Sequence, residues 1–213
     1  MQPRFISSCM ADWDADSAQL EQNLRSVLET IQDDSRRRTV VSVETARLWH
    51  TGVLRGLAVP DPRYIGRFRG EPGLEKVQVH VGGRFGVAAR EVTTALAAFE
   101  RTLQPVIARL DGLIPAGNDP NTDQLAAILE VCAWVHAEWI RIHPFANGNG
   151  RTARLWVNSI SMRYNLPPFL RLRPRPDAGY GDAGAEAMRG NWQPTIAMVR
   201  RHLEDFLHAP ASK

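Results

Sequence analysis

The sequence predicts a mainly α-helical fold, a compact helical bundle that carries one small β-hairpin. Apolar residues recur three or four positions apart through most of the 213 residues, which is the period of helices that bury one face. Val77, Val79 and Val81 alternate with polar residues instead, which is the period of a strand. A hydrophobic content of 44% is sufficient for a buried core.

Two helices are expected before the hairpin. The first begins near Ser17 and keeps its apolar stripe as far as Ile31. The second has Ser42 as its N-cap, because a serine hydroxyl can accept a hydrogen bond from the first helical turn, and it ends near Gly56. Residues 1–14 show no clear pattern.

The hairpin is expected to span Val77–Val87, with a tight turn at Gly82-Gly83. Two strands alone are only marginally stable in water. The hairpin is therefore expected to pack against the helical core or to pair with another segment.

Helical patterns resume after the hairpin. One starts at Val92, and Pro105 is expected to kink or end it, because proline removes a backbone donor and clashes with the preceding turn. A long helix is expected to begin with Thr122 as its N-cap and to reach Ile142. Beyond residues 171–179, a connector rich in proline and arginine, further helical patterns follow towards the C-terminus.

The stretch from His143 to Arg154 joins two helical patterns and concentrates the chemistry. It reads His-Pro-Phe-Ala-Asn-Gly-Asn-Gly-Arg-Thr-Ala-Arg. Gly148-Asn149-Gly150 precedes a helix start, where backbone N–H groups and the helix dipole attract an anion. Arg151 and Arg154 lie three positions apart and share a face of the first turn. A histidine base, backbone donors and positive charge are the groups that nucleotide phosphoryl chemistry needs.

The composition argues against several classes of protein. There is no apolar run long enough for a transmembrane helix, and the N-terminus lacks the pattern of a secretory signal. Cys9 and Cys132 are too few for a disulfide framework, and Cys132 is interpreted as a small core residue. These observations predict a cytoplasmic protein with no membrane partner.

The net charge of +3 includes dense basic groups at Arg36–Arg38 and at Arg171, Arg173 and Arg175. Because no nucleic-acid-binding signature accompanies them, we interpret both groups as solvated surface and expect no nucleic-acid partner. His136 is interpreted as a packing or supporting residue. Four other histidines are interpreted as surface residues: His50, His80, His202 and His208. The tryptophans are interpreted as core.

The stretch from His143 to Arg154 resembles the signature of the Fic family, His-Pro-Phe-x-(Asp/Glu)-Gly-Asn-Gly-Arg-x-x-Arg, and departs from it at one fixed position. Tyr64–Arg69 is similar to the family's aromatic-x-Gly-x-aromatic-Arg segment. Val77–Val87 falls where the family places its target-docking hairpin, the flap.

The resemblance covers roughly residues 42–207 and implies a Fic-like catalytic domain there. Residues 1–41 would form an N-terminal segment with one helix, and residues 208–213 a C-terminal tail.

The resemblance implies a protein adenylyltransferase, which moves AMP from ATP to a hydroxyl side chain of a target protein and releases pyrophosphate. His143 would be the general base, and Phe145 would anchor the loop in the core. The phosphates of ATP would be held by Gly148, Asn149 and Gly150, by Arg151 at the β-phosphate and by Arg154 at the γ-phosphate. A target segment would be clamped by strand addition to Val77, Gln78, Val79, His80 and Val81.

The position that departs from the signature is Asn147, where the family has an Asp or Glu that ligates Mg²⁺. An amide oxygen is neutral and binds this hard cation more weakly. Mg²⁺ is therefore expected as a cofactor of reduced affinity. Two alternatives stay open: a transferase that moves phosphate or another nucleotide, and a non-catalytic nucleotide-binding module.

Many members of the family are inhibited by a helix with the sequence (Ser/Thr)-x-x-x-Glu-(Gly/Asn), whose glutamate pairs with the second arginine of the signature. The sequences around Glu21, Glu44 and Glu204 do not match it. We hypothesise that inhibition comes from a separate small protein, an antitoxin that acts in trans.

Overall fold

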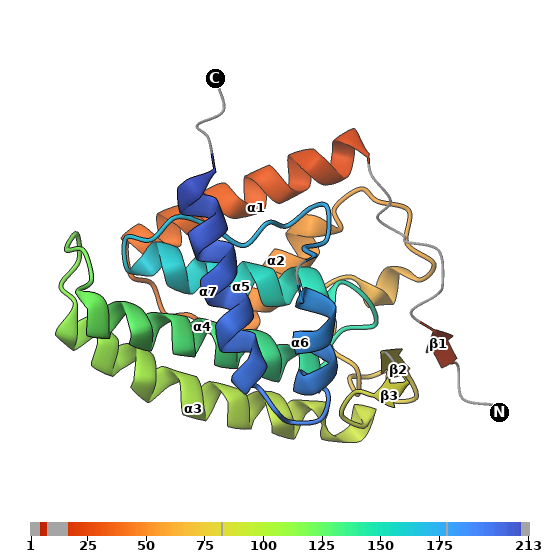
Figure 1. The fold of residues 1–213 in the computed structure, drawn as a ribbon. Coiled ribbons are helices and arrows are strands. Elements are labelled where there is room, and N and C mark those ends of the chain that lie inside the picture. The colour runs from red at the N-terminus through yellow and green to blue at the C-terminus, as the bar shows by residue number, and fades with distance from the viewer. Residues whose placement is uncertain (1–4, 8–16, 82, 178, 210–213) are drawn as a thin grey trace.

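The computed structural model describes residues 5–7, 17–81, 83–177 and 179–209. Cys9 and Gly82, which the sequence predictions mention, lie outside these residues. The fold is mainly helical with one small sheet, as the sequence predicts (Figure 1). The elements are β1 (Phe5–Ser7), α1 (Ala18–Arg36), α2 (Val43–Val53), β2 (Gln78–Val81), β3 (Arg84–Phe85), α3 (Val92–Leu113), α4 (Thr122–Ile142), α5 (Asn149–Arg163), α6 (Tyr180–Ala187) and α7 (Gln193–His208).

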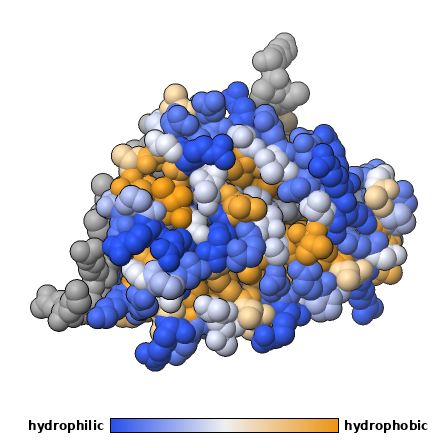
Figure 2. All heavy atoms as spheres, turned by 180° about the vertical axis from the view of Figure 1, so that it is seen from behind, coloured by the Kyte–Doolittle hydropathy of each residue, from blue (hydrophilic) through white to orange (hydrophobic). Residues whose placement is uncertain are grey.

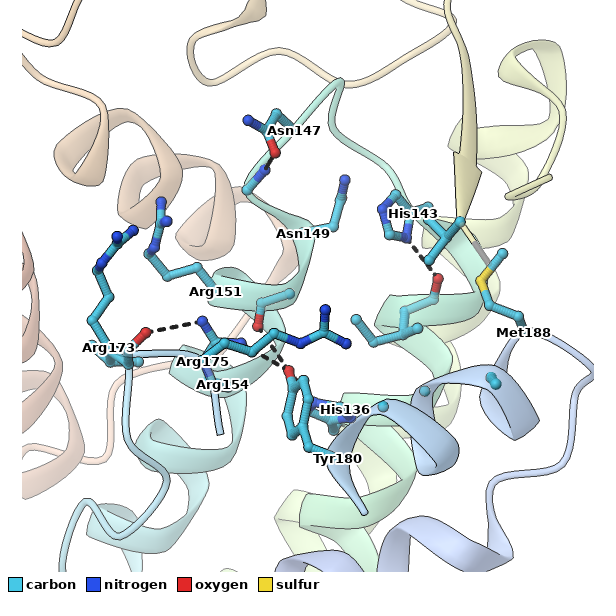
Figure 3. Close-up of a pocket in the computed structure, with 18 of the residues that line it drawn as sticks. His136, His143, Asn147, Asn149, Arg151, Arg154, Arg173, Arg175, Tyr180 and Met188 are labelled. Carbon is cyan, nitrogen blue, oxygen red and sulfur yellow. Dashed lines mark hydrogen bonds between the residues drawn. The ribbon is translucent and has the colours of Figure 1, made fainter. Parts of the chain in front are cut away.

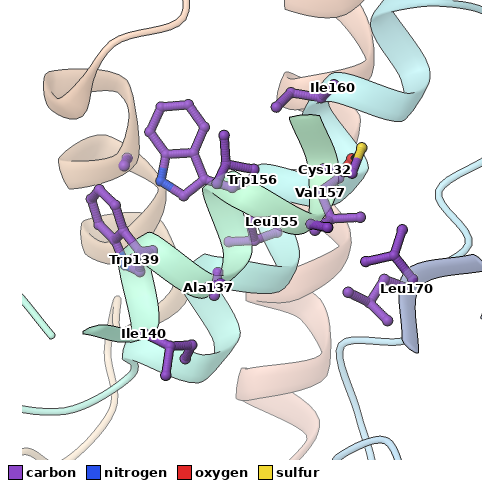
Figure 4. Close-up of a cluster of buried hydrophobic side chains, with 14 of the residues drawn as sticks. Cys132, Ala137, Trp139, Ile140, Leu155, Trp156, Val157, Ile160 and Leu170 are labelled. Atoms are coloured by element: carbon purple, nitrogen blue, oxygen red, sulfur yellow. Dashed lines mark hydrogen bonds between the residues drawn. The ribbon is translucent and has the colours of Figure 1, made fainter. Parts of the chain in front are cut away.

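Helices α4 and α5 form the centre of the bundle. They pack on each other, α3, α6 and α7 contact α4, and α1 and α2 contact α5 (Figure 1). Trp139 of α4 and Trp156 of α5 are fully buried, with their ring centroids 5.6 Å apart. Phe99 of α3 meets both indoles edge-on (Figure 4 shows the two tryptophans). Burying such large aromatic surfaces contributes strongly to stability, so the loop between α4 and α5 is held at both ends by the most tightly packed part of the core.

The helix starts follow local side-chain chemistry. Ser42 caps α2 as predicted, and Ser17, near which the first helix was expected to begin, caps α1; each accepts a hydrogen bond from the first turn. The predicted cap of α4 is wrong by one residue, because Asn121 and not Thr122 occupies that position. The Asn121 Oδ1 accepts from the backbone N–H of Gln124, while the Gln124 side chain accepts from the N–H of Asn121, which is a reciprocal capping box.

Of the two predicted outcomes at Pro105, a kink or an end, the end is wrong, because α3 continues past it to Leu113. Pro105 and Arg101, whose carbonyl loses its helical donor, both lie on the exposed side of the helix, where water can satisfy that carbonyl. Ile107 and Leu110 are buried beyond the proline and keep the rest of the helix on the core.

The predicted hairpin is confirmed but shorter, with β2 and β3 antiparallel and Val81 opposite Arg84. The structure adds β1, which pairs in parallel with β2 and gives the strand order β1-β2-β3. Phe5 lies opposite Gln78 in this register. A strand of three residues is too short to show alternation, so the sequence pattern did not reveal it.

A partly buried ion pair connects the far end of α5 to its neighbours. Arg163 donates to both carboxylate oxygens of Asp111 at 3.0 and 2.7 Å, and also to the carbonyls of Arg38 and Thr39. Burial acts to raise the pKa of Asp111, but the hydrogen bonds and charge of Arg163 outweigh it, so that this pKa lies below its ordinary value.

The surface is mixed in character. Figure 2 shows, on the face behind that of Figure 1, small groups of hydrophobic residues separated by hydrophilic ones. None of the helices in the described part of the chain combines the length and apolar character that a membrane span requires. Cys132 is fully buried on α4, as predicted, and burial raises the pKa of its thiol.

Candidate active site

A pocket of about 560 Å³ opens between the end of α4, the start of α5, the connector after α5 and α6 (Figure 3). The structure brings together in its lining most of the residues that the sequence singled out. These are Val81, His143, Asn147, Gly148, Asn149, Gly150, Arg151 and Arg154. They come from three separate elements, so the fold assembles the site.

His143 is held in one tautomer at the end of α4. Its backbone is left-handed, with φ 53° and ψ 57°, and its N–H still donates to the carbonyl of Trp139. The ring Nδ1 lies 2.9 Å from the carbonyl oxygen of Ile140. A carbonyl can only accept, so Nδ1 carries the ring proton and Nε2 keeps a lone pair. Burial, together with the charge of Arg69, lowers the pKa of His143 to about 4, so the ring is a neutral base at physiological pH.

The loop after His143 is clamped by Asn149. The side-chain oxygen of Asn149 accepts from the Phe145 N–H, and its amide donates to the Phe145 carbonyl, both at 2.8 Å. Phe145 is fully buried, as the sequence predicts, and its ring packs against Phe68. Helix α5 has Gly148 as its N-cap and no side-chain cap. The first backbone N–H groups of this helix therefore stand at the pocket, as an anion site requires.

The prediction that His50 is a surface residue is wrong, because its side chain is buried and only 2% exposed. Its Nδ1 accepts from the Gly66 N–H at 3.0 Å, which leaves the ring proton on Nε2 to donate to the Asn147 carbonyl at 3.1 Å. The ring also stacks on Phe145 with centroids 3.8 Å apart. His50 thus fixes the loop through its contacts with Asn147 and Phe145. His80 and His202 are partly exposed and His208 is exposed.

Arg69 is fully buried and joins the loop to the hairpin. Its guanidinium donates to the carbonyls of His143 and Ile142 at the end of α4, and to those of Val77 and Val87 at the two ends of the hairpin segment. Its backbone N–H donates to Pro144. Burial lowers the pKa of Arg69 to about 10, so it remains charged at neutral pH.

The flap residues divide into two groups. Val77 and Val79 are buried against the body of the protein, whereas Gln78, His80 and Val81 are partly exposed and Val81 reaches the pocket. At the end of the hairpin, a Cβ on Gly86 would lie 2.8 Å from the Cβ of His143. The flap therefore approaches the candidate base as closely as backbone packing allows.

Arg154 lines the pocket and is 5% exposed. It donates to the hydroxyl of Tyr180 and to the carbonyl of Leu172, both at 2.9 Å. The Tyr180 hydroxyl also lies 3.0 Å from Nε2 of His136. His136 is buried, which agrees with its interpretation as a packing or supporting residue. Burial, reinforced by the charge of Arg154, lowers the pKa of His136 to about 3.

Arg173 and Arg175 correct the interpretation of their segment as solvated surface, since both line the pocket. Figure 3 shows Arg151 and Arg173 pointing towards the same end of the pocket, with Arg175 extending over Tyr180. Arg171 is exposed and is not among the lining residues. The sequence shows a dense group of arginines in this segment, but only the fold shows that two of them face the pocket.

The residues present do not fit a carboxylate-bound Mg²⁺. The side-chain oxygen of Asn147 accepts from the Gly148 N–H at 2.7 Å, and its backbone oxygen accepts from His50. The described residues that line the pocket include no Asp or Glu. Both oxygens of the one candidate ligand are therefore already in use, and neither carries a charge.

Replacing Arg69 with methionine is expected to destabilise the fold by about 3 kcal/mol or more, because four buried carbonyls lose a charged donor. Urea unfolding measures this change. The matched control is Arg67→Met, two positions away, where a more exposed arginine donates to Pro72. Equal stability of the two variants would show that Arg69 does not hold the hairpin and loop together.

The sequence model of the Fic/DOC family matches residues 41–161. Protein adenylyltransferase fic-1 of Caenorhabditis elegans is 31% identical over 170 residues, 80% of this chain and 28% of that protein. Protein adenylyltransferase Fic of Nematostella vectensis is 40% identical over 82 residues, 38% of this chain and 19% of that protein. The chain thus spans less than a third of either relative.

Solved structures agree on the fold. A Fic-domain-containing signalling protein from Bacteroides thetaiotaomicron superimposes with a TM-score of 0.62 at 18% identity, over 89% of this chain and 70% of the other. C. elegans Fic-1, residues 134–508, gives 0.55 at 23% identity, over 91% of this chain and 52% of the other. The family match covers more than half of the sequence, including the loop between α4 and α5 and the pocket residues up to Arg154, and this chain therefore belongs to the Fic/DOC family.

Proposed function

We propose that this chain is a protein adenylyltransferase, which transfers AMP from ATP to a hydroxyl side chain of a target protein. The observation that carries the proposal is the fixed tautomer of His143, whose unprotonated Nε2 belongs to the same pocket as the start of α5 and its arginines. The names of the relatives support the same activity. We keep residues 42–207 as the catalytic unit of this proposal.

The pocket offers separate places for the two parts of ATP. Its basic side, at α5, suits the phosphates, since Arg151 and Arg154 flank a helix start. Its other side is apolar and lies along α6. There Gly181, Gly184 and Met188 share one face of the helix, and a Cβ on Gly184 would meet nothing within 4 Å. The absence of side chains at Gly181 and Gly184 leaves room for a nucleoside beside the apolar Met188.

In the proposed reaction, Nε2 of His143 accepts the proton of the target hydroxyl. The hydroxyl oxygen then forms a bond to the α-phosphorus as the bond from that phosphorus to the β-phosphate oxygen breaks, and pyrophosphate leaves. Arg151 and Arg154 hold the departing phosphates and offset the charge that develops on them. Because the residues around Asn147 do not fit Mg²⁺, no step depends on the metal.

The target segment would reach His143 along the hairpin. The edge of β2 already pairs with a strand, β1, which supports the idea that this edge accepts extended chains. Gly86 brings the hairpin against His143, so a hydroxyl on a segment docked there would lie near the base.

Replacing His143 with alanine is expected to lower transfer of label from α-labelled ATP to protein by at least about a hundredfold, because the reaction loses its base. His208→Ala is the matched control, since His208 is exposed and its ring bonds to the Glu204 carbonyl of its own helix. Undiminished transfer by the His143 variant would reject the proposed role. Label that arrives from γ-labelled ATP instead would show that phosphate, and not AMP, is the transferred group.

The transfer rate is expected to stay constant from about pH 8 to about pH 5 and to fall at lower pH, with a midpoint near pH 4. The reason is that the pKa of His143 is lowered to about 4. A rate profile checked by circular dichroism at each pH tests this. The unfolded chain binds protons at His143 and His136 below about pH 6.5, before the folded chain does, so stability also declines as the pH falls through this window. A midpoint near 6.5 in a folded protein would contradict the assignment.

We propose that inhibition, where it occurs, comes from a separate protein. Glu21 is exposed and pairs with Arg25, and Glu44 pairs with Arg47, and neither glutamate is among the residues lining the pocket.

Accordingly, Glu21→Gly and Glu44→Gly are each expected to leave the rate of self-modification unchanged, as measured by incorporation of α-labelled ATP. A large rise in either variant would reveal an inhibitor within the chain and reject the proposal.

A further inference from the structure

Three helices meet at the hydroxyl of Tyr180, in the lining of the pocket (Figure 3). His136 belongs to α4, Arg154 to α5, and Tyr180 is the first residue of α6. None of these three side chains is more than 5% exposed. Polar groups buried so deeply cost free energy unless they are hydrogen-bonded. The surrounding donors and acceptors therefore determine where the protons of this junction lie.

The ring proton of His136 can be assigned from its surroundings. Burial lowers the pKa of His136 to about 3, so the ring is neutral and carries one proton. Its Nδ1 is buried and has no hydrogen-bond partner among the described residues. A proton on Nδ1 would be a buried donor without an acceptor, which is costly. We therefore place the proton on Nε2, which donates to the Tyr180 oxygen at 3.0 Å.

The hydroxyl proton of Tyr180 is then directed to the start of α5. Arg154 can only donate, so its Nη1–H occupies a second acceptor position of the Tyr180 oxygen, at 2.9 Å. The hydroxyl itself donates to the carbonyl of Gly150, 3.4 Å away. A Cβ on Gly150 would lie 3.6 Å from Nη1 of Arg154 and 3.8 Å from the Tyr180 oxygen. One hydroxyl thus joins the arginine to the helix start that the proposed reaction uses.

Arg154 is held at its tip by two contacts. Nη1 donates to Tyr180, and Nη2 donates to the carbonyl of Leu172 at 2.9 Å. The Nε–H is buried and has no partner among the described residues, so an acceptor on a bound ligand would satisfy it. An arginine side chain has many rotamers, and fixing it before the ligand arrives lowers the entropic cost of binding.

We propose, on the basis of the proposed function, that Tyr180 is a positioning residue, whose hydroxyl holds the guanidinium of Arg154 and the start of α5 in one arrangement for the departing phosphates of ATP. His136 supports this role, because its Nε2–H occupies the phenol oxygen and directs the phenol proton to Gly150. Tyr180 acts through Arg154 and not on the reacting atoms. A charge that is fixed in advance stabilises a developing negative charge without reorientation.

Tyr180→Phe tests this role, because it removes the hydroxyl and keeps the ring. Isothermal titration calorimetry measures binding of two probes, ATP and AMP. The affinity for ATP is expected to fall about tenfold, the effect of losing one hydrogen bond to a charged group, and that for AMP, which lacks the departing phosphates, to stay within about twofold.

Tyr164→Phe is the matched control. Tyr164 is also buried and its hydroxyl is hydrogen-bonded, to Asp111, but it is not among the residues that line the pocket. Its variant is expected to bind both probes with the wild-type affinity.

A double-mutant cycle with Arg154→Met separates positioning from a general effect on the pocket. If Tyr180 acts through Arg154, Tyr180→Phe causes no further loss of ATP affinity in the Arg154→Met background. An equal loss in both backgrounds would overturn the proposal, and so would equal losses of ATP and AMP affinity. Thermal melts verify that every variant is folded.

The cycle is measured on binding, so its outcome does not depend on turnover. The expected cycle in a chain that does not transfer label from α-labelled ATP rejects the proposed function alone. An additive cycle in a chain that does transfer the label rejects the positioning role alone. Failure of the wild-type chain to bind ATP rejects both.

Discussion

One buried guanidinium determines how the candidate active site is held together. Arg69 donates to carbonyls at the end of α4 and at both ends of the hairpin segment, so three pieces of irregular backbone share the donors of a single side chain. Carbonyls without a partner inside a protein are strongly destabilising. The hairpin cannot move away from His143 without breaking these bonds. The position of the candidate base relative to the flap consequently depends on the side chain of Arg69.

The rest of the site depends on this constraint in turn. Asn149 and His50 fix the loop from its two sides, and the indoles of Trp139 and Trp156 fix the helices that the loop joins. Rigid helices with a clamped loop between them place catalytic groups more precisely than a free loop would. The pocket residues on α6 and on the connector are attached less directly, chiefly through Tyr180 and Arg154.

The sequence revealed those parts of the fold and site that depend on local order along the chain. The helices carry clear apolar stripes, the strand β2 alternates, and the residues from His143 to Arg154 are contiguous, so each could be predicted. His50 was missed because its partners, Gly66 and Asn147, lie far from it in sequence and no local pattern marks a histidine that will be buried. Arg173 and Arg175 were noticed as charge but not as pocket residues, because the chain between α5 and α6 has no periodic pattern, and Arg175 is directed by its contact with Tyr180 of α6. A helix end at Pro105 was one of two predicted outcomes and is wrong, because the rule for proline takes no account of which side of the helix faces water.

The parallel pairing of β1 with β2 changes what docking at the hairpin means. In the order β1-β2-β3, both edges of β2 are occupied, one by β3 and the other by residues 5–7 of the same chain. A strand from another protein can pair with β2 only after displacing β1. Because β1 is tethered, its effective concentration at that edge is on the order of millimolar, as for segments joined by short linkers. A segment of another protein therefore competes with β1 for the edge of β2. This competition favours segments that bind β2 more tightly than β1 does.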